Sequence, residues 1–176
     1  YFNLGEIQYT DENGNPGGIG HPNEFSIAAG YARKLSDRFA LSAAAKYIYS
    51  NLAAGQTLGL STINVGHAFS VDIGMRYEQP ITDKQFLVLG LNLGDIGTKI
   101  SYIKDYEYFI PANMALGANY TFKLDDHNNL SLLAEANKLM VPTPPLSRDP
   151  DDVEEYLNTT SVGGIIKSFY DAPNGW

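Results

Sequence analysis

Apolar and polar residues alternate along most of this chain with a period of two, the pattern of β-strands whose two faces meet different surroundings. The clearest stretch is 69–77, where every second residue is large and apolar and the residues between are small or polar. The same alternation recurs in 25–31, 39–49, 87–93, 110–122 and 130–137. Weaker strands are predicted near 2–9 and 161–170. The pattern therefore predicts an all-β fold, and no helix that could cover the sheet is evident.

The connections between these strands alternate between short and long. Tight turns are predicted at 35–38, 82–85 and 125–128, each with Asp, Asn or Ser to supply turn chemistry. The other connections are long and polar or rich in glycine, at roughly 10–24, 50–67, 95–109 and 138–160. Outer-membrane barrels sort their connections in this way, with short periplasmic turns and long external loops. A soluble β-sandwich has no reason to do so.

The two faces of the predicted strands also fit a membrane. One face carries Leu, Ile, Val, Phe, Met, Ala and Tyr, and the other carries mostly Gly, Ala, Ser and Asn. The strands are about ten residues long, enough for a tilted strand to cross the hydrocarbon layer. Tyrosines near strand ends suit an aromatic girdle; they are Tyr31, Tyr47, Tyr49, Tyr77 and Tyr120. We predict an antiparallel transmembrane β-barrel in the cell outer membrane, with the apolar rows at 69–77 and 87–93 facing lipid.

The small inward residues and the chain ends bear on closure of the barrel. Eight strands make a narrow barrel filled by its own side chains, and Gly, Ala and Ser fill little volume. The chain opens at Tyr1 without a signal peptide and ends in a loop-like stretch, where Pro173 and Gly175 interrupt the alternation before Trp176. We therefore expect 1–176 to be a single β-barrel domain that is incomplete at both ends.

Composition removes several classes of function. The 176 residues carry a formal charge of −8, which argues against nucleic acid as a partner. The absence of cysteine excludes disulfides and cysteine nucleophiles. No nucleophile elbow or phosphate loop is found. The acidic stretch 11–15 is interpreted as a polar surface turn, because Pro16 and Pro22 occupy positions where a calcium loop needs Gly and Glu. The acidic stretch 149–155 is interpreted as a solvated loop, with binding of calcium or of a basic partner as the alternative. We predict no enzyme activity, no cofactor and no metal.

Four segments, in order along the chain, resemble the PorV family of the type IX secretion system of Bacteroidota. They are 35–52, 93–102, 109–117 and 164–173. The family is related in architecture to FadL-like transporters with fourteen strands. The resemblance therefore implies a partial chain of a 14-stranded FadL-like barrel.

The resemblance also implies a function. PorV-like proteins bind cargo by its C-terminal signal domain at the giant translocon barrel (SprA or Sov). They then shuttle it to the attachment complex, in which PorU, PorQ and PorZ take part. The family has no catalytic residues to carry over.

The chain's own residues indicate one contact loop. Aromatic side chains are enriched at interface cores, which makes Tyr102, Tyr106, Tyr108 and Phe109 the candidate partner-binding residues. Packing within the loop is the alternative interpretation of these four.

Two other functions stay open at this point. The first is a FadL-like channel for hydrophobic small molecules, in which Gly90, Gly94 and Gly117 could kink strands. The second is a soluble lipid carrier of the lipocalin type, which the sorting of the loops disfavours.

Overall fold

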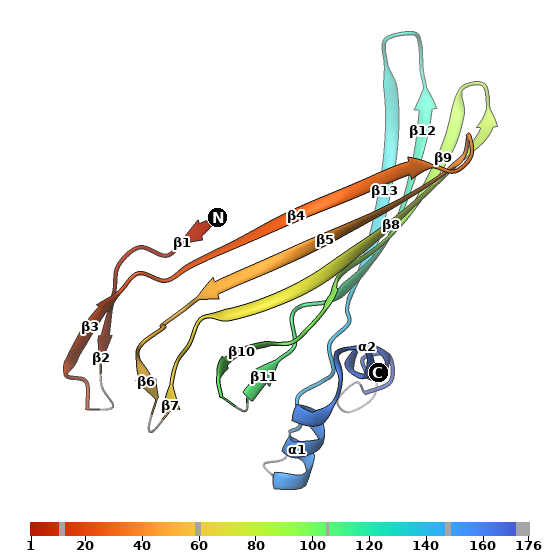
Figure 1. Cartoon of the computed structure of the whole chain (residues 1–176). Helices are drawn as coiled ribbons and strands as arrows, with labels where there is room; N and C mark the ends of the chain where they lie inside the picture. The colour runs from red at the N-terminus through yellow and green to blue at the C-terminus, as the bar shows by residue number, and fades with distance from the viewer. Residues whose placement is uncertain (11–12, 59–60, 105, 147–148, 172–176) are drawn as a thin grey trace.

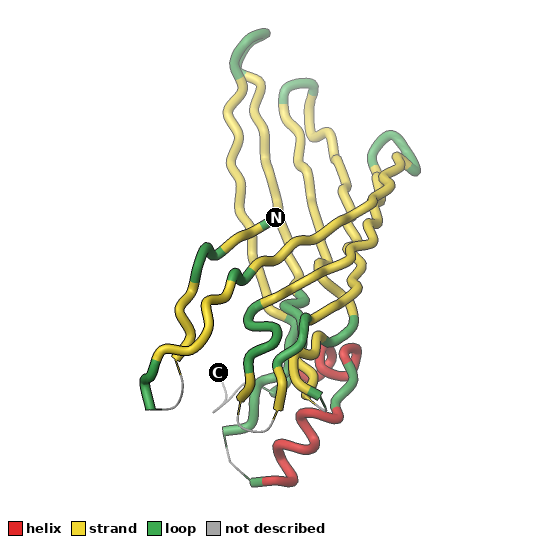
Figure 2. The backbone as a smooth tube through the Cα atoms, turned by 60° about the vertical axis from the view of Figure 1, so that its left-hand side comes forward, coloured by secondary structure: helices red, strands yellow, loops and turns green. Residues whose placement is uncertain are grey.

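Seven antiparallel strands form one continuous sheet that curls strongly into a half-barrel (Figures 1 and 2). The computed structural model describes residues 1–10, 13–58, 61–104, 106–146 and 149–171. In spatial order the strands are β1 (Phe2–Asn3), β4 (Asn23–Lys34), β5 (Phe39–Asn51), β8 (Gly66–Thr82), β9 (Gln85–Gly97), β12 (Asn113–Lys123) and β13 (Asn129–Leu139). The prediction of an antiparallel all-β fold consistent with a partial barrel is confirmed. That 1–176 is one barrel domain, incomplete at both ends, stays a prediction.

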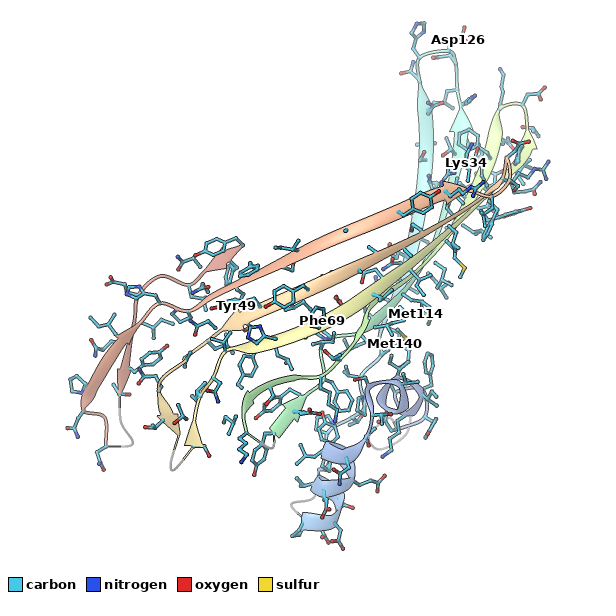
Figure 3. All side chains as sticks on the ribbon, viewed as in Figure 1. Lys34, Tyr49, Phe69, Met114, Asp126 and Met140 are labelled. Carbon is cyan, nitrogen blue, oxygen red and sulfur yellow. The ribbon has the colours of Figure 1, made fainter. Side chains whose placement is uncertain are left out.

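Three short turns join the strand pairs β4–β5, β8–β9 and β12–β13 at one end of the sheet, where Figure 3 labels Lys34 and Asp126. The last turn is organised by Asp125. The side-chain amide of Asn128 and the backbone N–H groups of His127 and Asn128 donate to its carboxylate over 2.8–3.0 Å. These bonds lower the pKa of the Asp125 carboxyl below its ordinary value. All three predicted turns are confirmed.

The opposite end carries the long connections, and three of them fold into small hairpins. These pair β2 (Ile7–Thr10) with β3 (Pro16–Gly20), β6 (Thr57–Leu58) with β7 (Ser61–Thr62), and β10 (Ile100–Ile103) with β11 (Tyr106–Tyr108). The single strand predicted near 2–9 is two strands, β1 and β2. Gly5 lies between them with φ of 76°, a left-handed conformation that interrupts an extended chain.

The prediction of a strand at 161–170 is wrong, and the long loop predicted at 138–160 contains a helix. Helix α1 spans Pro150–Asn158 and helix α2 spans Ser161–Lys167. Asp149 caps α1 by accepting from a backbone N–H of its first turn. Thr160 caps α2, its hydroxyl accepting from the N–H of Gly163 over 3.1 Å. These caps satisfy amides that a helix start leaves without partners.

Within the described part of the chain, neither helix has the length and hydropathy of one that spans a membrane.

The sheet has little interior of its own. Among the described residues, the buried apolar side chains are Ala68, Ile100, Ile110, Ala112 and Met140, all near the junction between the strands and the long connections. Large apolar side chains are instead exposed along one face of the sheet; Phe69, for example, is 62% exposed. The rows at 69–77 and 87–93 are therefore not covered by the rest of the described chain.

Candidate functional site

The outward face of the sheet has the chemistry of a membrane-facing belt. Between β5 and β8 an aromatic pair lies at each end, Phe39 opposite Tyr77 and Tyr47 opposite Phe69. The three outward pairs between them are entirely aliphatic or thioether: Leu41–Met75, Ala43–Ile73 and Ala45–Val71. Tyr47 lies eight positions after Phe39, roughly 27 Å along a strand, which suits a tilted strand crossing an apolar band roughly 25 Å tall.

The girdle at the long-connection end is the denser of the two. Phe25 stacks on Tyr49 with ring centroids 4.7 Å apart, and Tyr47 lies 5.2 Å from Phe69. The Tyr47 hydroxyl is 2.8 Å from Nδ1 of His67. Aromatic rings with one polar edge are the side chains that favour the boundary between hydrocarbon and water.

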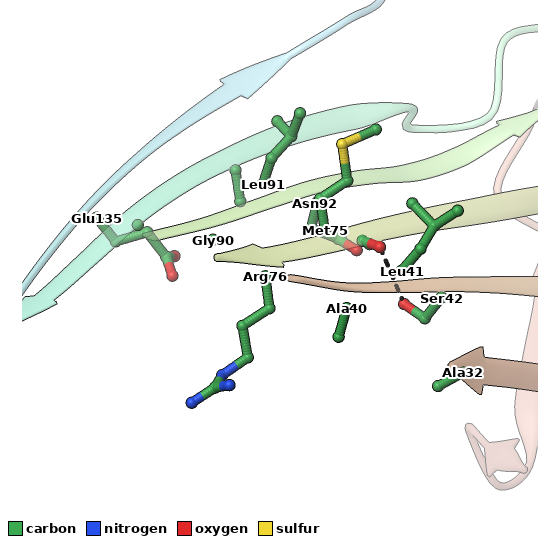
Figure 4. A pocket seen from close by; sticks show the side chains of 13 residues that line it. Ala32, Ala40, Leu41, Ser42, Met75, Arg76, Gly90, Leu91, Asn92 and Glu135 are labelled. Atoms are coloured by element: carbon green, nitrogen blue, oxygen red, sulfur yellow. Dashed lines mark hydrogen bonds between the residues drawn. The ribbon is translucent and has the colours of Figure 1, made fainter. Parts of the chain in front are cut away.

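The concave face is lined by small side chains, as Figure 4 shows, with Leu91 and Met75 directed to the other side of the sheet. A groove of about 430 Å³ runs along it, and most of its floor is Gly, Ala or Ser. Arg76 and Glu135 also line this groove. Arg76 pairs with Glu78 over 2.7 Å, and Glu135 accepts from Asn137 over 2.7 Å. The inward face thus leaves open space, as the sequence indicated.

A three-residue ion cluster lies on the concave face nearer the long connections. The Lys46 ammonium is 2.7 Å from Asp95 Oδ1 and 3.3 Å from Asp72 Oδ2. Ser70 donates to the same Asp95 oxygen over 3.1 Å. All three charged side chains are between 21% and 28% exposed, so one cation is shared by two partly buried carboxylates.

A β-bulge brings Asp95 into that cluster. Ile73 pairs with Leu93, and Val71 pairs with Ile96. Between these two cross-strand pairs, β9 carries one more residue than β8. Asp95 lies at this bulge in a left-handed conformation, with φ of 54°. Its backbone N–H donates to the Asp72 carboxylate over 2.8 Å. Bulges re-aim side chains in this way. The register is regular at Gly90 and Gly117, where the channel hypothesis placed kinks, and shifts beside Gly94.

The four aromatic residues proposed for partner binding do not form one patch. Tyr102 is half-buried, and its hydroxyl donates to Ser50 Oγ over 2.8 Å. Its ring lies so close to Gly66 that a Cβ there would be 2.7 Å from a ring carbon. Tyr106 and Tyr108 are 50% and 47% exposed, although the Tyr108 ring lies 6.4 Å from that of Tyr102, and they are the more accessible pair of the four.

Phe109 joins the sheet end to the helices. The Lys99 ammonium lies 4.5 Å above its ring, and the Tyr156 ring of α1 packs edge-on at 5.5 Å. Lys99 also donates to the carbonyl of Leu157 over 2.6 Å. Burial against this group raises the pKa of the Tyr156 hydroxyl. Phe109 therefore holds α1 in place.

Replacing Phe109 with alanine is expected to loosen α1 without unfolding the sheet. The lost ring pair is worth about 0.5–1.5 kcal/mol beyond its buried area. Hydrogen exchange of the full-length protein should show faster exchange in 150–158 and unchanged exchange in the long strands. The matched control is Tyr108→Ala, one residue away and exposed. Equal exchange in the two variants would contradict this role of Phe109.

The acidic stretch 149–155 is structured by its own contacts. Beyond the Asp149 cap, Glu155 pairs with Lys167 of α2 over 2.6 Å, and this bond raises the pKa of the Lys167 ammonium. Of the 11–15 stretch, Asp11 and Glu12 lie outside the described residues. No group of three or more His, Asp or Glu side chains that could hold a metal occurs among the residues that the structure describes.

Comparison with known families gives one match that spans the strands. A family model described as type IX secretion system protein PorV matches residues 1–146, from the first strand to just before α1. No curated protein matches the chain.

Proposed function

Because the chain belongs to the PorV family of type IX secretion system proteins, we propose that it is the membrane-anchored component that receives secreted cargo. Membership gives the role in type IX secretion and makes the chain a secretion component, not a member of a known enzyme family. Within secretion, the protein binds cargo by the cargo's C-terminal signal domain at the translocon barrel. It then carries the cargo to the attachment complex with PorU, PorQ and PorZ. The observation that carries it is the family match over 1–146.

The outer membrane is the proposed location. The aromatic rows and the aliphatic rows between them give the outward face the composition of a lipid-facing belt. In this orientation the three short turns are periplasmic, and the hairpins and helices lie outside the cell. That side is where cargo emerges from the translocon.

The β10–β11 hairpin is the proposed contact with cargo or translocon. Tyr106 and Tyr108 stand exposed on it, while Tyr102 and Phe109 fix it to the sheet and to α1. An anchored hairpin loses little conformational freedom on binding, and tyrosines are among the side chains that contribute most to interfaces.

Changing both exposed tyrosines to serine should weaken cargo association by about tenfold or more, since interface tyrosines often contribute above 1 kcal/mol each. The measurement is co-purification of a cargo signal domain and of the translocon with the full-length double variant. The control is Lys104→Ser with Glu107→Ser, which changes two exposed, non-aromatic residues of the same segment. Wild-type association by an inserted Tyr106→Ser, Tyr108→Ser variant would remove this hairpin from the proposal.

A FadL-like channel is the second candidate, favoured by the groove of about 430 Å³ on the concave face. A channel of that kind predicts saturable uptake of labelled fatty acid into liposomes that contain the full-length protein. The shuttle predicts uptake no faster than in liposomes with an unrelated closed barrel.

A further inference from the structure

We propose that α2 and the turn that follows it lie in the outer leaflet of the membrane, with Val162 and Ile166 of the helix and Phe169 and Tyr170 of the turn in contact with acyl chains. This inference rests on the outer-membrane location proposed above. It assigns a lipid-binding role to the part of the described chain that follows the family match.

Helix α2 lies on the outward side of the sheet. Lys138 of β13 pairs with Met114 of β12 in the ladder, so both point to the apolar, outward face. The Lys138 ammonium donates to the carbonyl of Ser168 over 2.8 Å and lies 5.0 Å from the Phe169 ring. The C-terminal end of α2 is therefore held against the side of the sheet that carries the membrane belt.

A groove shared with the strands places the start of α2 near the aromatic girdle. A groove of about 610 Å³ is bounded by Ser161 of α2 and, on the outward face, by Tyr47, Phe69 and Ile96. Lys46 and Ser70 of the ion cluster also line it. Ile96 pairs with Val71 beyond the bulge and shares its outward direction. The groove is mostly apolar and opens beside the girdle, so acyl chains that surround the belt would continue into it.

The helix itself has two faces. Gly164 and Ser168 are buried, and a Cβ at Gly164 would lie 2.7 Å from the Phe109 ring. Val162 and Ile166, four residues apart in α2, are 62% and 57% exposed, and Phe169, three residues on in the turn that follows α2, is 52% exposed. Tyr170 beside them is 71% exposed. Residues at this spacing share one side of a helix, so the buried side packs on the protein and an apolar stripe faces away from it.

The charges around α2 fit a membrane boundary. The Lys167 ammonium of α2 is paired with the Glu155 carboxylate of α1. The acidic α1 lies beside the β10–β11 hairpin, farther than α2 from the short-turn end of the sheet, as Figure 1 shows, and so reaches toward water. Helices that lie in the interface combine an apolar stripe with polar residues on the other side, and tyrosine is favoured at that depth. Continuity with the girdle therefore favours lipid as the occupant over a protein partner.

The test measures the depth of single labels in the full-length protein. Ile166→Cys, Phe69→Cys and Val153→Cys variants, in a background without other cysteines, carry an environment-sensitive fluorophore. The protein is inserted into vesicles that contain lipids spin-labelled near the headgroup or deep in the chain. Phe69 reports the belt, and Val153 on α1 is the matched helical control. We expect shallow spin labels to quench the Ile166 label several-fold more strongly than the Val153 label.

The three labels separate the possible failures. Quenching at Phe69 with none at Ile166 would overturn the placement of α2 and leave the outer-membrane location intact. An absence of quenching at both Phe69 and Ile166 would overturn the location as well. Protection of Ile166 that appears only when purified translocon is added would assign the stripe to a protein partner and would also contradict the inference.

Discussion

Exchanging Leu116 for arginine is expected to destabilise the inserted protein by about 2–4 kcal/mol, the cost of a lipid-facing arginine near the middle of a bilayer. Leu116 is 50% exposed on the outward face of β12, between Leu91 and Ala136 in the neighbouring strands. It lies four residues from Tyr120 at the turn end. The measurement is urea unfolding of the full-length protein in lipid vesicles.

The neighbouring residue gives the matched control. Ala115 points into the open groove of the concave face, where an arginine would find room and water. Ala115→Arg should therefore cost much less than Leu116→Arg. A soluble sheet would tolerate the Leu116 change, because that side chain would already stand in water. Equal and small effects of the two changes would mean that the outward face does not meet hydrocarbon.

Removing the charge of Lys46 is expected to give the second large effect. Lys46→Met leaves the carboxylates of Asp72 and Asp95 without their shared cation beside the bulge. Breaking a fully buried pair costs about 3–5 kcal/mol, and the partial exposure of these groups lowers our expectation to about 1–3 kcal/mol. Thermal unfolding in detergent, followed by the heat-dependent gel shift of the full-length protein, measures the loss.

A compensating variant separates charge from packing. Adding Asp72→Asn and Asp95→Asn to Lys46→Met removes the repulsion and keeps an acceptor for the Asp95 backbone N–H. We expect this triple variant to regain most of the lost stability. If it remains as unstable as Lys46→Met alone, the lysine acts through its aliphatic stem.

The strands were predictable because the two faces of each one meet different surroundings. At 69–77 the alternation persists over nine residues, and the turn chemistry around Asp125 fixes where β12 ends and β13 begins. The Asp95 bulge was not predictable. Its left-handed residue follows Gly94 and looks like the start of a loop, and its role depends on Lys46, distant in sequence.

The helices were missed although the sequence carries helix-start signals. Asp149 followed by Pro150 is a common N-cap and first-turn pair, and Thr160 precedes a run whose spacing suits either structure. Two adjacent isoleucines, Ile165 and Ile166, favour a strand in a chain whose other apolar segments are predicted to be strands. The sequence also could not show which of the four aromatic residues at 102–109 pack against the protein and which stay exposed. Phe109, for example, is covered by Tyr156, which is far along the chain.

The edges of the sheet have a consequence for how the barrel folds. Within the described residues, the outer edge of β4 has no neighbour in the sheet apart from the short pairing with β1, and β13 has a neighbour on one side only. Hydrocarbon cannot hydrogen-bond the bare amides and carbonyls of such edges. In the proposed outer-membrane location, insertion of this sheet therefore depends on both edges finding hydrogen-bond partners. We expect insertion to be cooperative with the pairing of both edges, and a mutation at either edge to slow it.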